Sequence, residues 1–331
     1  MSAVRGQPLL RVRDLKTHFS SRSGVAKAVD GVSFDLYAGE TLGLVGESGS
    51  GKSVTCLSIV RLVPQPAGKI VAGEVLLGDT NILTLDDEEM REIRGSRISY
   101  ITQDPLTSLD PLYRIRAQVG EPMLAHRRAT RADVREKVIE MLRKVRIPAP
   151  QVRADQFPHE MSGGMRQRVV TALALGCHPE LLIADEPTTA LDVTVQAQIL
   201  RLLRDLHEET GLSMILVTHD FGIVARACDR VAVMYAGRIV EIAAVADIFE
   251  RPSHPYTIGL MASVPRIGTR LPRMVSIEGQ PPDVRRLPPG CPFAPRCTAR
   301  MDVCTEAYPP TVQLGDGHEV ACWAVEREVG R

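Results

Sequence analysis

Hydrophobic and polar positions follow two different periods along this chain. Unbroken apolar runs at 41–45, 181–184 and 214–217 predict buried strands. Between them, apolar residues recur every three or four positions, at 134, 138, 141, 142 and 145 and again at 195, 199, 202, 203 and 206, which predicts amphipathic helices. Strands that alternate with helices indicate an α/β core with a largely parallel sheet.

The remaining segments have other patterns. Residues 9–40 carry short apolar stretches broken by Gly24, Gly31 and Gly39, which is typical of an antiparallel β-subdomain. Apolar residues at 231–235 and 238–242 flank Ala236-Gly237 and predict a hairpin.

Two further segments differ from the rest in residue pattern and composition. Residues from about 104 to 161 predict a helical insertion, in which Thr130 to Asp133 resemble a capping box and Pro148 and Pro150 end the helix. Prolines are dense beyond Arg251, so few long elements are expected there. We therefore predict a nucleotide-binding domain at 8–250, with the helical insertion inside it, and a small irregular C-terminal domain rich in cysteine and proline at 251–331.

A complete P-loop motif follows the first apolar run. It reads G-x-x-x-x-G-K-S and consists of Gly46, Glu47, Ser48, Gly49, Ser50, Gly51, Lys52 and Ser53. The glycines allow backbone N–H groups to curl around phosphate oxygens, and the helix N-terminus adds a partial positive charge. Lys52 is expected to reach the β- and γ-phosphates and Ser53 to bind Mg²⁺. The motif predicts that the chain binds a nucleoside triphosphate.

Two more polar groups fit the same chemistry. Asp185 ends the second apolar run, where a carboxylate is expected to act on Mg²⁺, and Glu186 follows as a candidate general base. Ser162, Gly163 and Gly164 begin a predicted helix and form a second anion-binding turn. One triphosphate does not need two such turns, so two chains packed head to tail are expected to complete each other's sites.

The ordered set of motifs resembles an ATP-binding-cassette (ABC) ATPase across roughly residues 8–250. The set also includes Gln103 after an apolar strand, Ala190-Leu191-Asp192, and His219 after the third strand. The resemblance implies that Gln103 senses Mg²⁺ and the membrane partner, that Glu186 is the catalytic base, that Asp192 lies at the dimer interface and that His219 contacts the γ-phosphate. Phe19, which from its residue type alone fits either the core or an adenine stack, matches the adenine-stacking position.

One departure from the family concerns the signature turn. Its commonest form is Leu-Ser-Gly-Gly-Gln, whereas Met161 and Met165 stand at the flanking positions here. A thioether hydrogen-bonds poorly in place of the Gln amide. The serine and glycines that touch phosphate remain, so we expect the turn to function in the partner's site.

The composition limits the alternatives. Lys plus Arg equals Asp plus Glu at 40 each, so no overall charge indicates nucleic acid or anionic lipid as the partner. Aromatic residues make up 4% of the 331 residues, which argues against a stacking surface for single-stranded nucleic acid. No apolar run is long enough to span a bilayer and no secretory signal begins the chain. We therefore expect a peripheral protein on the cytoplasmic face of the cell membrane, held there by partners.

The tail resembles that of dipeptide and oligopeptide importer ATPases. The resemblance rests on residues 254–260, on Gly279-Gln280-Pro281-Pro282 and on residues 290–297. It implies a related second ATPase, two transmembrane permease subunits and a peptide-binding protein as partners. Nickel importers share this ATPase type, so the tail does not fix the solute.

Four of the seven cysteines, Cys291, Cys297, Cys304 and Cys322, lie in this tail. Ligation by sulfur alone suits zinc or a [4Fe–4S] cluster, and the spacing lacks the short C-x-x-C pairs of zinc ribbons. Some members of the peptide-importer family bind [4Fe–4S] here, which favours iron; four buried thiols without metal are the alternative. Cys56, Cys177 and Cys228 are expected to be core residues.

These observations predict the ATP-hydrolysing subunit of a peptide importer, with ATP and Mg²⁺ as ligands. A nickel importer ATPase is one alternative, and a soluble ABC ATPase that acts on nucleic acid or ribosomes is another. The second would usually carry two cassettes, long coiled coils or strongly basic regions, and none of these appears. A redox-sensing role for the tail is compatible with the first reading.

Overall fold

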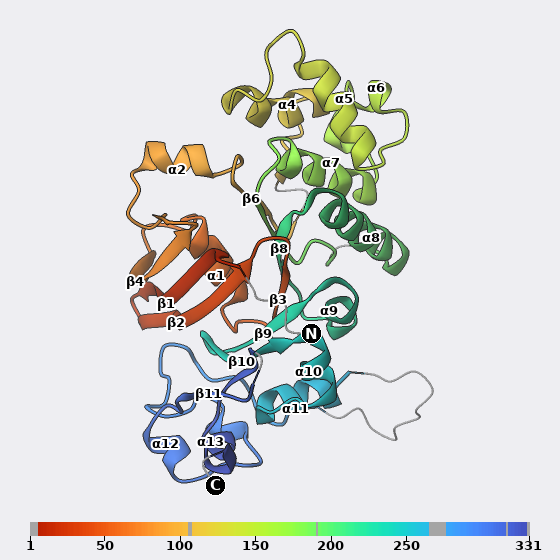
Figure 1. Ribbon diagram of the computed structural model, residues 1–331. Helices are drawn as coiled ribbons and strands as arrows, with labels where there is room; N and C mark the ends of the chain where they lie inside the picture. The colour runs from red at the N-terminus through yellow and green to blue at the C-terminus, as the bar shows by residue number, and fades with distance from the viewer. Residues whose placement is uncertain (1–5, 105–107, 190, 265–275, 316, 330–331) are drawn as a thin grey trace. The chain divides into compact units, whose positions relative to one another are not determined.

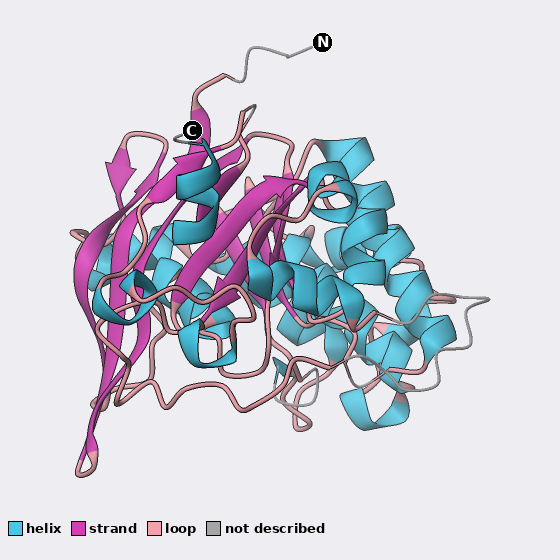
Figure 2. Cartoon of the chain, turned by 90° about the horizontal axis from the view of Figure 1, so that it is seen from below, coloured by secondary structure: helices cyan, strands magenta, loops and turns pink. Residues whose placement is uncertain are grey.

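A computed structural model describes residues 6–104, 108–189, 191–264, 276–315 and 317–329. The chain forms two compact units. The first contains the residues up to Tyr37, Thr41–Leu83 and the residues from Thr218 onward, and the second contains Ala38–Glu40 and Thr84–Val217. Helices and strands occur in both units, and Figure 2 colours the chain by secondary structure.

The first unit contains most of the strands, and many of them are labelled in Figure 1. Its elements are β1 (Pro8–Ser21), β2 (Gly24–Tyr37), β3 (Thr41–Val45), α1 (Lys52–Ile59), β4 (Gly68–Leu77), β5 (Thr80–Asn81), α9 (Phe221–Ala227), β9 (Arg230–Tyr235), β10 (Arg238–Ala244), α10 (Val245–Glu250), α11 (Pro255–Ala262), the 3₁₀ turn η2 (Ala294–Arg296), α12 (Val303–Glu306), β11 (Thr311–Gln313), β12 (Glu319–Ala321) and α13 (Trp323–Val329).

The strands of this unit confirm the sequence-based interpretation. An antiparallel sheet has the strand order β2-β1-β4-β5, and the long β1–β2 hairpin closes between Ser21 and Gly24. Strand β3 is completely buried and pairs in parallel with β9. Strands β9 and β10 form the predicted hairpin, in which Ala236 and Gly237 take φ of 47° and 83°, as a type I′ turn requires.

The second unit is mostly helical. Its elements are α2 (Asp87–Ile93), β6 (Ile98–Ile101), α4 (Ile115–Ala125), α5 (Val134–Lys144), α6 (Pro150–Arg153), the 3₁₀ turn η1 (Pro158–Glu160), α7 (Gly163–Leu175), β7 (Leu181–Asp185), α8 (Val193–Thr210) and β8 (Ser213–Val217). Strands β6, β7 and β8 pair in parallel. The apolar faces predicted for α5 and α8 lie in one core cluster with Val169 and Leu182.

The start and end predicted for the first of these helices were wrong in detail. The Thr130 N–H and hydroxyl both donate to the Asp133 carboxylate, at 2.6 and 2.9 Å, so the Thr130 side chain does not cap the helix. Helix α5 begins one turn later, at Val134, and ends at Lys144. Pro150 does not end it but occupies the first position of α6, where the missing N–H costs nothing.

The C-terminal elements are short, as the prolines predicted, and pack against β9 and β10. Strand β12 pairs antiparallel with β10. The rings of Tyr235, Tyr256 and Phe293 lie with centroids 4.6 to 5.3 Å apart in the apolar cluster of this region. Glu241 on β10 is fully buried and accepts a 2.8 Å hydrogen bond from His318 and a 3.0 Å bond from the His254 N–H. A buried polar contact therefore joins the tail to the cassette strands.

Candidate functional site

The P-loop has the backbone that phosphate binding requires. Gly46, Gly49 and Gly51 have φ of 150°, 79° and 105°, a region that side chains with a Cβ rarely occupy. A Cβ on Gly46 would lie 2.3 Å from the Met234 carbonyl oxygen, and one on Gly51 would lie 2.4 Å from the Ala28 carbonyl oxygen. Gly46 and Gly51 are therefore required both because there is no room for a Cβ and because their φ angles disfavour one.

Side chains in the same loop are arranged for an anion. Lys52 is buried at the start of α1, and its ammonium group donates to the carbonyl oxygens of Gly46 and Glu47 at 2.8 and 3.0 Å. The buried Ser50 hydroxyl has no hydrogen-bond partner among the described residues. Ser48 and Gly49 are exposed. The loop thus offers a cation and an unpaired buried hydroxyl beside an accessible turn, which suits a phosphate group.

Two other predicted site residues lie in the first unit. Phe19 is a half-buried residue of β1, paired with Ala26 across the hairpin and with Gly68 on β4. A Cβ on Gly68 would lie 2.7 Å from the Phe19 ring, so the ring lies over this glycine. His219 is exposed and immediately precedes Asp220, whose side chain caps α9 by accepting the Gly222 N–H. The adenine and γ-phosphate roles of Phe19 and His219 stay predictions.

In the second unit, the end of β7 presents the first carboxylate. Asp185 is buried with 4% exposure and accepts a 2.7 Å hydrogen bond from the hydroxyl of Tyr100. Tyr100 lies on β6, the strand next to β7 in the sheet, and was missed by sequence reasoning. One sequence signal could have identified Tyr100. It lies three residues before Gln103, on a strand that the order of the motifs places beside the strand that ends at Asp185.

The second carboxylate has a strained backbone and two polar partners. Glu186 takes φ of 46°, which is unusual for a residue with a side chain. Its carboxylate accepts hydrogen bonds from the Gln103 amide at 3.1 Å and from the Thr189 hydroxyl at 2.8 Å. The structure therefore brings Gln103 and Glu186 together, as a shared site requires. Thr189 was missed by sequence reasoning, although a hydroxyl three residues after the carboxylate is a local signal.

The signature turn begins a helix, as predicted. Ser162 is exposed and caps α7 by accepting the Met165 N–H at 3.3 Å. Asp192 caps α8 in the same way, accepting the Val195 N–H at 2.9 Å. A Cβ on Gly164 would lie 2.7 Å from Val195, which places the two helix starts in contact. Ala190, the first residue of the Ala-Leu-Asp motif, lies outside the described residues.

The flanking methionines of this turn belong to the core. Met161 is 5% exposed, and the partly buried Met165 packs against the same apolar cluster. Apolar side chains at these positions therefore stabilise the helix start from within the chain. The Ser162 and Gly163 positions remain accessible on the surface.

The four tail cysteines line one small, largely apolar cavity together with His254 and Phe293. Burial raises the pKa of Cys291 to about 11 and also raises the pKa of Cys297 and Cys322. Neutral thiols are therefore favoured until a cation binds. Within the described part of the chain, no group of three or more His, Cys, Asp or Glu side chains has the arrangement of a metal site. The four thiols share this cavity, and a metal centre at this place stays a prediction.

The other three cysteines lie apart from this cavity. Cys56 is buried in α1, Cys177 is buried just after α7, and Cys228 follows α9 against the apolar cluster of the first unit. Burial raises the pKa of Cys177 and of Cys228, the latter to about 12. Buried neutral thiols of this kind are core residues, as their sequence context predicted.

The P-loop, the carboxylates after β7 and the Ser-Gly-Gly helix start define an ATPase of the ATP-binding-cassette class. Residues 29–189 match the family model described as ABC transporter, and residues 240–304 match the model described as oligopeptide/dipeptide transporter, C-terminal region. The chain belongs to the family of ATP-binding subunits of oligopeptide and dipeptide ABC transporters. It is an ABC ATPase, for which ATP and Mg²⁺ are the expected ligands.

Relatives and solved structures agree with this assignment. The "Probable peptide ABC transporter ATP-binding protein y4tR" of Sinorhizobium fredii is 54% identical over 95% of this chain and 94% of its own length. The "Dipeptide transport ATP-binding protein DppD" of Bacillus subtilis is 50% identical over 96% of this chain and 95% of its own length. The ATP-binding cassette MJ0796, in a dimeric post-hydrolysis state bound to ADP and Pi, superimposes with a TM-score of 0.64 at 28% identity, covering 71% of this chain and 98% of the cassette.

Proposed function

We propose that this chain powers the import of short peptides through a membrane ABC transporter, by nucleotide-driven closure of an ATPase dimer. The match of residues 240–304 to the oligopeptide/dipeptide transporter C-terminal region carries this proposal, because it extends the likeness beyond the P-loop cassette. We assign residues 8–250 to the cassette and 251–331 to the C-terminal domain. The names of the relatives support peptides over nickel as the solute, and over nucleic acid or ribosomes as the target.

The site residues have distinct parts in this function. The P-loop binds the triphosphate, with Lys52 on its β- and γ-oxygens. Ser53, Gln103 and Asp185 would hold Mg²⁺, which when bound neutralises phosphate charge. Glu186 orients and deprotonates the attacking water, and its contact with Gln103 supports a shared role.

The ATPase partner supplies the rest of the site. A second ATPase chain presents its own Ser162 to Gly164 turn, or the equivalent turn of a related chain, to the bound phosphate. The exposure of Ser162 and Asp192 supports this, because a turn that serves another chain must be accessible. Alternating closure and reopening of the two chains would drive the transport cycle.

The helical segment of the second unit offers a surface for the membrane partners. An open pocket there is lined by some of the residues between Ser108 and His126 and by Leu173. Tyr113, which lines it, is 58% exposed, and Leu112 beside it in the sequence is 80% exposed. No helix in the described ranges is long and apolar enough to cross a membrane. We propose that the permease subunits dock here and that a peptide-binding protein delivers the solute to them.

We propose that Cys291, Cys297, Cys304 and Cys322 hold a [4Fe–4S] cluster, with zinc as the alternative. Their shared cavity supports a site in which a cation replaces the thiol protons. The centre would cross-link a segment of short elements. Iron, acid-labile sulfide and zinc are measured on protein purified without oxygen. Iron and sulfide that are lost in Cys297→Ser indicate the cluster, and zinc alone indicates a structural zinc site. The absence of both metals would contradict both proposals.

Uptake in a strain that lacks this chain tests the transport proposal. Labelled di- to hexapeptides are supplied to cells that carry the wild-type gene, an empty vector or Glu186→Gln. Uptake restored by wild type alone is expected. Nickel uptake restored instead would identify the nickel alternative, and unchanged uptake of every peptide would contradict the proposal.

A further inference from the structure

The C-terminal domain contacts the P-loop through a partly buried ion pair. Arg296 ends the 3₁₀ turn η2 and is only 5% exposed, and its two terminal nitrogens donate to the two carboxylate oxygens of Glu47 at 2.7 and 3.0 Å. Two parallel bonds between guanidinium and carboxylate fix the orientation of both groups. Glu47 is the second residue of the P-loop, so the tail reaches into the phosphate-binding loop itself.

The same pair is fixed on both sides by further bonds. Arg296 also donates to the carbonyl oxygens of Glu278 and Ile277, at 3.0 and 3.3 Å, which fixes it within the tail. The Glu47 N–H donates to the Tyr256 hydroxyl at 2.9 Å. Tail residues thus hold the main chain and the side chain of Glu47 together.

The charge of Glu47 explains what this pair does for the loop. A carboxylate in a loop that receives a triphosphate repels it, and the repulsion is strong where burial lowers the effective dielectric constant. Arg296 supplies the compensating positive charge. Without it, Glu47 would keep a negative charge beside the phosphates, with only its main-chain contacts unchanged.

We propose that Arg296 is a positioning residue for the P-loop, which sets ATP affinity by neutralising and orienting Glu47. The C-terminal domain is then part of the nucleotide site, independent of which solute or metal the protein handles. The inference rests only on ATP binding by the P-loop. By linkage, bound ATP stabilises the tail in return.

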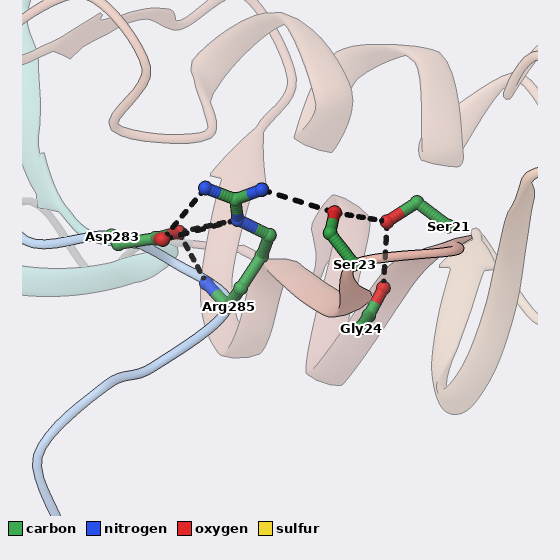
Figure 3. Close-up of polar contacts among 5 residues, drawn as sticks. All are labelled: Ser21, Ser23, Gly24, Asp283 and Arg285. Atoms are coloured by element: carbon green, nitrogen blue, oxygen red, sulfur yellow. Dashed lines mark hydrogen bonds and ion pairs between the residues drawn. The ribbon is translucent and has the colours of Figure 1, made fainter.

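A second contact, shown in Figure 3, connects the tail to the β1–β2 hairpin. Arg285 is held by Asp283 and donates to the Ser23 hydroxyl at 3.1 Å. The hydroxyl oxygens of Ser23 and Ser21 lie 2.9 Å apart, and the Ser21 hydroxyl donates to the Gly24 carbonyl oxygen. The Ser23 hydroxyl therefore donates to Ser21, because each hydroxyl has one proton. The hairpin that this contact stabilises carries Phe19 on β1. The tail therefore contacts both the phosphate loop and the hairpin with the candidate adenine-stacking residue.

Steady-state ATPase kinetics on the full-length chain test the proposal. Arg296→Met is expected to raise the KM for ATP about tenfold with kcat within about twofold, because it weakens binding and leaves Glu186 untouched. Glu47→Gln alone removes the charge that Arg296 neutralises and completes the double-mutant cycle. The double variant should return KM to near the wild-type value, because removing the carboxylate removes the need for its partner.

Two control variants keep the test specific. Arg13→Met removes a single-bonded 2.6 Å ion pair with Asp35 on the antiparallel sheet and should leave KM unchanged. Arg296→Lys keeps the charge and should raise KM less than Arg296→Met does. If the methionine variant does not fold, the KM of the lysine variant still tests the proposal. An unchanged KM in Arg296→Met, or a double variant as weak as Arg296→Met, would overturn the proposal. A wild-type chain that does not bind ATP would instead contradict the family function, before any variant is compared.

Discussion

The side-chain amide of Gln103 donates a 3.1 Å hydrogen bond to the carboxylate of Glu186. The two residues are separated by most of the second unit in sequence, and β6 and β7 bring their strands side by side. If Gln103 contacts a membrane partner, as predicted, this hydrogen bond would connect that contact to the candidate base. This contact gives the predicted sensor role a physical route.

Glu186→Gln is expected to retain ATP but to lose turnover. The amide keeps the size of the side chain and loses the basic oxygen, and general-base catalysis contributes about 10²- to 10⁴-fold to rate. Nucleotide binding and kcat are measured on the same preparation. Glu208→Gln, an exposed glutamate on α8, is the control and should behave like wild type. Turnover of Glu186→Gln at the wild-type rate would remove this residue from the role of base.

Tyr100→Phe is expected to raise the Mg²⁺ concentration that half-saturates ATPase activity by about tenfold, because the Tyr100 hydroxyl orients the Asp185 carboxylate. The measurement is a Mg²⁺ titration at saturating ATP. Tyr113→Phe, at an exposed tyrosine of the same unit, is the matched control. An unchanged Mg²⁺ requirement in Tyr100→Phe would show that this hydrogen bond does not position a metal ligand.

Much of this fold and site could be predicted from the sequence, because motifs and strand patterns are local signals. The P-loop glycines, the buried β7 run and the capping serine of α7 each follow from residue type and short spacing. The Glu47–Arg296 pair could not be predicted in this way, since its partners are 249 positions apart and no local pattern links them. The wrong prediction for Thr130 has another cause. A hydroxyl can donate a hydrogen bond as well as accept one, and spacing in the sequence does not decide which it does.

The tail shows the same limit for a possible metal site. The sequence shows four cysteines in a proline-rich segment, and the structure gathers them around one cavity. Neither cysteine spacing nor thiol burial distinguishes iron from zinc, because both metals accept four sulfur ligands. Whether a metal is bound there, and which one, is decided by a measurement of composition and not by the fold.

Stability is expected to show an acid-dependent contribution from Asp30. Burial alone would raise the pKa of Asp30, but the hydrogen bond and charge of Arg238, with the charges of Lys27 and His18, hold it below its usual value of 3.8. A lowered pKa in the folded state means that this stabilisation is present above pH 3.8 and is lost as the pH falls through the folded-state pKa.

Urea unfolding of Asp30→Asn and wild type tests this dependence. At pH 7 the variant should be less stable by about 2 kcal/mol, because Arg238 loses its charged partner. The difference should shrink as the pH falls below 3.8. Asp79→Asn is the control, since the Asp79 side chain is 97% exposed and lies 4.0 Å from Arg11. A difference that stays constant from pH 7 to pH 3 would show that the charge of Asp30 is not its source.

Two adjacent glycines of the signature turn are expected to respond differently to alanine. A Cβ on Gly164 would lie 2.7 Å from Val195 within the same chain, so Gly164→Ala should lower the melting temperature. A Cβ on Gly163 would lie 3.7 Å from Leu191, an ordinary contact, so Gly163→Ala should fold like wild type. If the turn binds phosphate on a partner chain, however, that Cβ would obstruct the approach of the partner's nucleotide.

Melting temperature and ATPase rate of both variants separate these effects. Gly163→Ala is expected to melt with wild type, bind ATP normally through its own P-loop and lose most ATPase activity, because hydrolysis needs the closed dimer. Mixing it with Lys52→Ala chains, which have an intact turn and a disabled P-loop, should restore activity at one of the two composite sites. A Gly163→Ala chain that hydrolyses ATP at the wild-type rate would contradict the closure of each site by its partner.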